Sequence, residues 1–133
     1  MKTETPQTIY LKDYTAPAYL VDTVDLVISI ETSATTVTAT LSMRRNPEVA
    51  AQPLVLDGDE LETQSVTVNG EKAVFFATPN TLTIEQLPDT FTLQTVVHIN
   101  PDKNTRLSGM YRSKDGYFTQ CEAQGFRRIT WFL

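Results

Sequence analysis

Hydrophobic and polar residues alternate along much of this chain, and the alternation predicts β-strands. Residues 24–31 follow a period of two, and residues 36–43 repeat it with a second face of threonine and serine. This period is typical of a strand that buries one of its faces. The short connection Ser33-Ala34 predicts that the two strands pair as an antiparallel hairpin. A third long alternation covers residues 91–99.

Shorter apolar segments between turn residues predict the rest of the fold. We expect these strands at residues 54–56, 60–68, 73–76, 82–84, 110–112 and 117–119. Asn69-Gly70 is the strongest hairpin signal, because a type I′ turn needs a positive φ at both central positions. A helical turn is expected from Gly125. Since no long stretch has a 3.6-residue period, the predicted fold class is all-β, a single antiparallel β-sandwich or saddle-shaped sheet.

The first 19 residues differ from the rest, because they are polar and are interrupted by Pro6 and Pro17. Their apolar side chains are Tyr10, Leu11, Tyr14 and Tyr19. We expect residues 1–19 to form an irregular arm packed on the domain, and residues 20–133 to form the β-sandwich itself.

Length and composition are those of one soluble globular domain. The chain has 133 residues, of which 41% are hydrophobic and 20% charged, and its formal net charge is −5. This acidic balance argues against a nucleic-acid partner, and no apolar run approaches the roughly 18 residues of a membrane-spanning helix. The start of the chain has no apolar segment after Lys2, unlike a secretory signal. With a single cysteine there is no internal disulfide, and both features predict a cytoplasmic protein.

Taken alone, the residues contain no recognisable catalytic set. Zinc needs three or four ligands, but the chain has one histidine, His98, one cysteine, Cys121, and no His-Glu-x-x-His motif. We expect His98 to be structural and Cys121 to be an inert thiol. Arg127 and Arg128 are expected to form ion pairs with acidic partners. We therefore predict no catalytic and no metal-binding residue in this chain.

The last residues of the chain contain many polar side chains that could bind a ligand, and their order is similar to that of a known protein family. Residues 120–130 read Gln-Cys-Glu-Ala-Gln-Gly-Phe-Arg-Arg-Ile-Thr. With Leu-Ser-Gly-Met-Tyr-Arg-Ser at 107–113 and Tyr-Thr-Ala-Pro-Ala-Tyr at 14–19, this segment resembles the close of the amino-terminal domain in bacterial aminopeptidase N, a family of gluzincin zinc exopeptidases. The resemblance covers nearly the whole chain and is most specific over residues 104–133. In family members the catalytic domain follows, so the resemblance implies a fragment that is inactive alone.

The roles that the resemblance implies fall on Glu122 and Gln120. In these aminopeptidases the glutamate at this position takes the free α-amine of the substrate, and the glutamine lines the pocket for the first residue. An α-ammonium with a pKa near ~8 is largely protonated at neutral pH, and a carboxylate accepts charge-assisted hydrogen bonds from it. The implied substrates are peptides with a free N-terminus, and the implied partner is the protein's own catalytic domain, whose zinc would be the cofactor.

A second interpretation stays open, in which the chain is a stand-alone β-sandwich binding or interaction module with no catalytic role, since fold does not dictate function. The two interpretations differ at the last three residues, Trp131, Phe132 and Leu133. The module predicts that they are buried against the domain itself. The aminopeptidase fragment predicts a poorly anchored tail that favours self-association.

Overall fold

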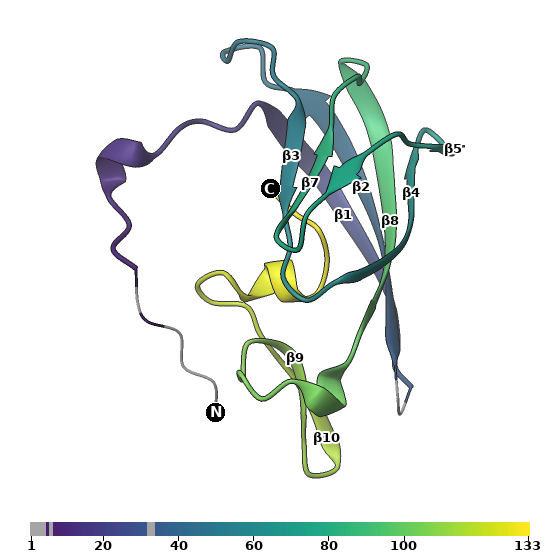
Figure 1. Ribbon diagram of the computed structural model, residues 1–133. Helices are drawn as coiled ribbons and strands as arrows, with labels where there is room; N and C mark the ends of the chain where they lie inside the picture. The colour runs from purple at the N-terminus through teal and green to yellow at the C-terminus, as the bar shows by residue number, and fades with distance from the viewer. Residues whose placement is uncertain (1–4, 6, 32–33) are drawn as a thin grey trace.

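The computed structural model describes residue 5, residues 7–31 and residues 34–133. Within these ranges the chain forms ten β-strands and three short 3₁₀-helices. All strand pairs are antiparallel, and they form three sheets (Figure 1). The all-β prediction is therefore confirmed.

The largest sheet has five strands in the order β1-β2-β8-β4-β5. Their bounds are Tyr19–Ser29 for β1, Thr35–Arg45 for β2, Thr90–Ile99 for β8, Glu62–Val68 for β4 and Glu71–Lys72 for β5. The predicted first hairpin is confirmed, because Leu26 lies opposite Ala39 and Ile28 opposite Val37 in the β1–β2 register. The predicted connection at Ser33 lies outside the described residues.

A smaller sheet, in the order β3-β7-β6, packs against the large one (Figure 1). Its strands are Leu54–Asp57 for β3, Thr81–Ile84 for β7 and Phe76–Ala77 for β6. The predicted inward faces of β2 and β8 are buried, and they meet the inward faces of β3 and β7 in one apolar core. This core includes Val37, Leu41, Met43, Leu54, Leu56, Leu82, Ile84, Phe91, Leu93 and Val97. The arrangement is the predicted β-sandwich, with a core that spans both sheets.

Strand β1 differs from the predicted half-buried strand. Val24, Leu26 and Ile28 point to the same side as Leu41, Ala39 and Val37, their register partners on β2. They are nevertheless 37–40% exposed, whereas the three partners are fully buried. The elements that pack on this face of the large sheet therefore cover β2 fully and β1 only in part. The alternation in the sequence shows which side chains share a face, but not how far that face is covered.

The predicted returning strand at residues 73–76 is also different. The turn at Asn69 and Gly70 has the expected positive φ values of 51° and 82°, but β5 ends at Lys72. The chain then leaves the large sheet and joins the small one as β6, which pairs with β7. The apolar run at residues 73–76 thus begins beside the large sheet and ends in the small one.

The arm before β1 extends away from the domain in the described residues (Figure 1). It contains one short helix, η1 (Leu11–Asp13). Leu11 and Tyr14 are largely exposed, in contrast to the expected packing on the domain. Attachment begins at Pro17, whose carbonyl oxygen accepts a 2.9 Å hydrogen bond from Asn46 Nδ2. None of the helices in the described part of the chain has the length and apolar character needed to cross a membrane.

Candidate functional site

A β-hairpin projects from one end of the sandwich and carries the candidate site. It consists of β9 (Gly109–Ser113) and β10 (Gly116–Gln120), as predicted, and lies at the bottom of Figure 1. The helix η2 (Pro101–Lys103) precedes it. Asn104 fixes the entry to β9, because its Nδ2 donates hydrogen bonds to the carbonyl oxygens of Ser108 (2.8 Å) and Met110 (2.9 Å).

Gln120 and Glu122 lie together where this hairpin ends. Gln120 is the last residue of β10, and its Oε1 accepts a 3.1 Å hydrogen bond from the backbone N–H of Glu122. Both side chains, and that of Cys121 between them, are exposed. The peptide bond after Glu122 is cis. The structure thus brings the two predicted substrate-binding residues together, with Gln120 at the end of β10 and Glu122 in the exposed loop that follows, residues 121–124.

Gly125 closes this loop back against its own beginning. Its N–H donates a 2.8 Å hydrogen bond to the carbonyl oxygen of Cys121. A Cβ at this position would collide with the carbonyl oxygen of Gln120 and would lie 2.9 Å from Ser108 Oγ. Only glycine therefore fits where the loop returns to the hairpin and the predicted helical turn, η3 (Gly125–Arg128), begins.

The residues after η3 are firmly anchored. Trp131 is 2% exposed, and its Nε1 donates a 2.8 Å hydrogen bond to Thr63 Oγ1. The backbones of Asp57 and Phe132 exchange two hydrogen bonds of 2.7 and 3.1 Å. The expectation of a poorly anchored tail is therefore wrong, because Asp57 and Thr63 supply hydrogen-bonding partners for it and Gly58 lies against the indole ring of Trp131.

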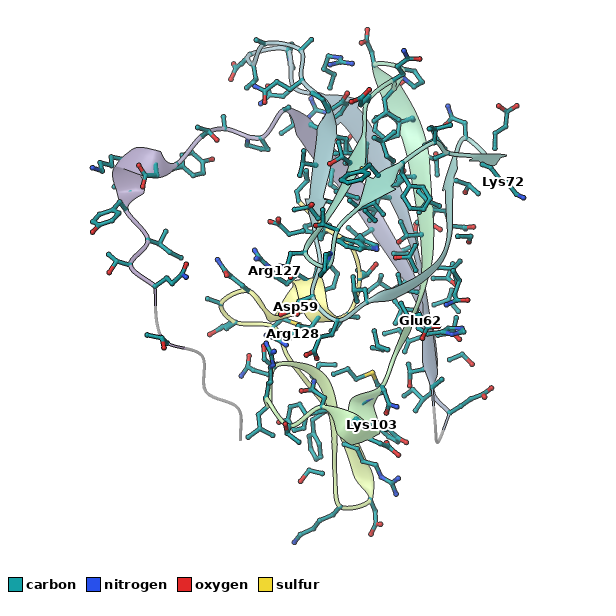
Figure 2. All side chains as sticks on the ribbon, viewed as in Figure 1. Asp59, Glu62, Lys72, Lys103, Arg127 and Arg128 are labelled. Atoms are coloured by element: carbon teal, nitrogen blue, oxygen red, sulfur yellow. The ribbon has the colours of Figure 1, made fainter. Side chains whose placement is uncertain are left out.

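Arg127 and Arg128 form the ion pairs expected of them. Arg127 Nη2 lies 3.4 Å from Asp57 Oδ2. Arg128 Nη2 lies 2.8 Å from Asp59 Oδ2, and both of these residues are labelled in Figure 2. Asp59 also contacts Arg106, whose Nη1 lies 3.5 Å from the same oxygen. Sequence reasoning missed Asp59 and Arg106, because the two lie 47 residues apart and their pairing leaves no local pattern. The only available signal was the acidic Asp-Gly-Asp-Glu run at 57–60, opposite in charge to the arginine pair.

Other candidate chemistry is sparse in the described part of the chain. His98 lies on β8, where Thr36 and Glu62 are its register partners. No group of three or more histidine, cysteine, aspartate or glutamate side chains among the described residues could hold a metal ion. A groove of about 840 Å³ lies between the β4–β5 hairpin and the small sheet, and Phe75 and Phe76 are among its lining residues. The strands that line this groove, β5 and β6 among them, lie away from the β9–β10 hairpin, toward the other end of the sandwich (Figure 1).

The chain is similar in sequence to bacterial aminopeptidase N. It is 39% identical over 135 residues to aminopeptidase N of Caulobacter vibrioides, which covers 99% of this chain and 16% of that protein. It is 40% identical over 132 residues to aminopeptidase N of Escherichia coli, which covers 98% of this chain and 15% of that protein. No protein-family model matches the chain.

Solved structures share the fold. Aminopeptidase A of Legionella pneumophila, determined in complex with aspartic acid, superposes with a TM-score of 0.83 at 27% identity, over 92% of this chain and 15% of that one. An M1 zinc metallopeptidase from Deinococcus radiodurans gives a TM-score of 0.70 at 16% identity, over 87% of this chain and 29% of that one. By sequence and fold, this chain is similar to the amino-terminal region of bacterial aminopeptidase N, and it spans 15–16% of the length of those relatives.

Proposed function

We propose that this domain is part of a cytoplasmic zinc aminopeptidase that removes residues from the free N-termini of peptides. In this proposal Glu122 binds the substrate's α-ammonium group, and Gln120 forms part of the pocket for the first residue. The observation that carries the proposal is that both side chains are exposed together at the end of β10. A hydrogen bond from the backbone N–H of Glu122 to Gln120 Oε1 links the two residues there. Its support is the similarity of the chain to aminopeptidase N.

An exposed carboxylate cannot anchor an amine tightly by itself. A solvent-exposed ion pair contributes about 0–1 kcal/mol, whereas a charge pair shielded from water contributes more to binding. Glu122 is exposed in this chain. Its anchoring role therefore needs a second surface that excludes water, and the parent's catalytic domain would supply it. For the same reason we expect the 133-residue chain to be inactive alone.

The remaining chemistry would come from the rest of the parent protein. Zinc, as the parent's cofactor, would polarise the scissile carbonyl and activate a water. Within this chain, the contribution is positioning. A carboxylate at a fixed distance from the reacting centre selects substrates that begin there, because an internal peptide bond carries no ammonium group. Holding the scissile bond in place is a recognised source of rate enhancement.

Replacement of Glu122 in the full-length protein tests the proposal. We expect Glu122→Ala to reduce kcat/KM for an aminoacyl chromogenic substrate. The reduction should correspond to a loss of about 2–5 kcal/mol in transition-state binding, the range for losing one partner of a buried charge pair. Glu71→Ala is the matched control, because Glu71 is also an exposed glutamate and lies on β5, at the other end of the sandwich. An unchanged kcat/KM in Glu122→Ala would remove the amine-anchor assignment.

The stand-alone binding module remains the alternative. Its specific support is the burial of Trp131 against the domain itself, together with the groove beside Phe75 and Phe76. Burial of the tail is equally compatible with the aminopeptidase proposal, since a firmly held tail keeps the adjacent loop in place. The sequence identity of 39–40% to aminopeptidase N favours the enzyme.

A further inference from the structure

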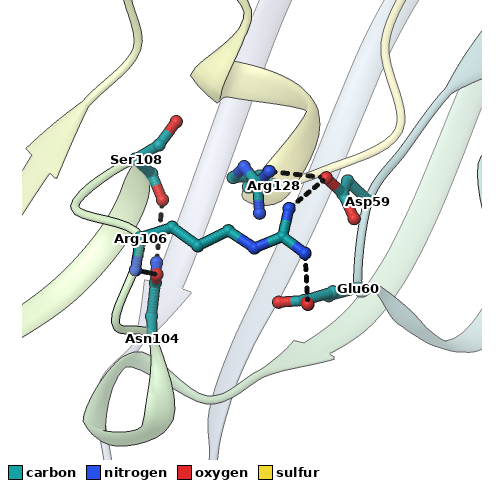
Figure 3. Close-up of polar contacts among 6 residues, drawn as sticks. All are labelled: Asp59, Glu60, Asn104, Arg106, Ser108 and Arg128. Atoms are coloured by element: carbon teal, nitrogen blue, oxygen red, sulfur yellow. Dashed lines mark hydrogen bonds and ion pairs between the residues drawn. The ribbon is translucent and has the colours of Figure 1, made fainter. Parts of the chain in front are cut away.

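Asp59 joins two chain segments on either side of the β9–β10 hairpin, the one before β9 that contains Arg106 and η3, which follows the loop 121–124. Its Oδ2 lies 2.8 Å from Arg128 Nη2, on η3, and 3.5 Å from Arg106 Nη1, just before β9. Figure 3 shows one carboxylate between two guanidinium groups that approach from different elements. Glu60 adds a second contact, since its Oε1 lies 3.3 Å from Arg106 Nη2.

These groups are shielded enough for their charges to matter. The side chains of Arg128, Arg106 and Asp59 are 13%, 15% and 23% exposed. Electrostatic attraction is stronger in such partly buried positions than at the surface. Without this carboxylate, the two positively charged guanidinium groups would lose the negative charge between them. Losing one partner of a buried pair is strongly destabilising. The arginines thus depend on Asp59 to stay close together.

The backbone connects this network to the loop on both sides. On one side, Gln120 pairs with Gly109 in the β9–β10 register. Asn104 connects Arg106 to β9, because its Oδ1 accepts a hydrogen bond from the backbone N–H of Arg106 and its Nδ2 donates one to the carbonyl oxygen of Met110. On the other side, the backbone N–H of Asp59 donates a 3.0 Å hydrogen bond to the carbonyl oxygen of Arg127 on η3. The four loop residues 121–124 therefore connect the β9–β10 hairpin to η3. Asp59 contacts the segment before the hairpin through Arg106 and η3 through Arg128, and so fixes their relative position.

We propose that Asp59 is a positioning residue that keeps Glu122 in the geometry needed to bind the substrate's amine. This inference rests on the proposed function, because it assigns Asp59 a task only if Glu122 is the anchor. Asp59 itself touches no substrate in this proposal. It acts by raising the fraction of molecules whose loop is ready to bind, and the apparent affinity of a ligand scales with that fraction.

The expected signature is a change in KM with little change in kcat. In the Asp59→Asn variant of the full-length protein, the loop samples other positions before substrate binds, but bound substrate still reacts. We expect KM for an aminoacyl chromogenic substrate to rise about 10-fold and kcat to change less than about 2-fold. Asp89→Asn is the control for losing an aspartate–arginine pair on a different part of the sandwich, where Asp89 pairs with Arg45 and its side chain is 90% exposed.

A double-mutant cycle separates positioning from general stability. If Asp59 acts through Glu122, Asp59→Asn raises KM about 10-fold in the wild-type background and less than about 2-fold in the Glu122→Ala background. An equal increase in both backgrounds, or an unchanged KM in the wild-type background, overturns the inference and leaves the amine anchor standing. If Glu122→Ala alone leaves kcat/KM unchanged, the anchor and the inference fall together.

A second variant covers the case in which Asp59→Asn does not fold. Arg106→Lys keeps the positive charge but loses the planar fork that lets Arg106 reach Asp59 and Glu60 at once. We expect this variant to raise KM about 3-fold, again only when Glu122 is present. A thermal melt of each full-length variant checks folding, and an Arg106→Lys effect that persists in Glu122→Ala contradicts the inference.

Discussion

The indole ring of Trp131 lies directly against Gly58, so closely that a Cβ added at Gly58 would overlap two ring carbons and lie 2.8 Å from Leu61 Cδ1. Gly58 follows β3 and lies between Asp57 and Asp59, the two aspartates that pair with the arginines of η3. Residues 57–59 therefore contact both the indole ring of Trp131 and the arginine side chains of η3. This contact adds to the hydrogen bonds with Asp57 and Thr63 that anchor the end of the chain.

The contact predicts a large effect from a small substitution. We expect Gly58→Ala to lower the free energy of unfolding by about 1–3 kcal/mol, the usual range for overpacking, because the backbone of Gly58 leaves no space for a methyl group. Gly70→Ala is the control, since nothing lies within 4 Å of its Cβ position and only its positive φ is unfavourable. Urea unfolding followed by the fluorescence of Trp131, the only tryptophan, measures both. A Gly58→Ala variant as stable as wild type contradicts the contact.

The uneven cover of the large sheet predicts unequal roles for two leucines. Leu41 on β2 is fully buried, whereas Leu26 on β1 is 38% exposed although it points to the same side of the sheet. We expect Leu41→Ala to reduce the free energy of unfolding by about 2–5 kcal/mol, the range for a buried leucine. Leu26→Ala should cost about 1 kcal/mol, because much of its surface stays in water. Equal losses in the isolated chain would show that β1 is covered in solution.

The same contrast shows what the sequence could predict. The inward faces of β2 and β8 were predictable, because a two-residue period fixes which side chains share a face. The exposure of Leu26 was not, because it depends on how far the second sheet extends. The run at residues 73–76 has the composition of a single strand, but the chain changes sheets inside it, and this choice depends on partners elsewhere in the fold.

For the site, sequence indicated the loop but not its support. Gln120 and Glu122 were recognisable from residues close to them in the chain, and their proximity in space follows from their spacing. Asp59 lies 47 residues from Arg106, and Thr63 lies 68 residues from Trp131. Neither pairing leaves a local pattern, so the network around Asp59 and the burial of the tail emerge only from the folded chain.

Gly125 should control the shape of the loop that carries Glu122. In the full-length protein we expect Gly125→Ala to lower kcat/KM at least about 10-fold, because its new methyl group displaces the carbonyl of Gln120 and shifts the anchor, and small misplacements of positioning groups are costly. Gly116→Ala, at the start of β10, is the control, since its methyl group meets only the side chain of Phe118 and the backbone of Ser113. Equal kinetics for the two variants would argue against a shaped loop.

The charge of Glu122 should be visible in the pH dependence of activity. The substrate's α-amine has a pKa near ~8, so above that pH it loses the proton that makes it a cation. A carboxylate partner then loses its charge-assisted hydrogen bonds, and kcat/KM of the full-length protein should fall as pH rises through this range. Glu122→Gln keeps the shape and removes the charge. We expect it to have a lower kcat/KM at pH 7 and a weaker decline between about pH 7 and 9, because the variant no longer distinguishes ammonium from amine by charge. A variant whose alkaline decline is as steep as that of wild type would assign the decline to another group, and Glu122 would then act by shape alone.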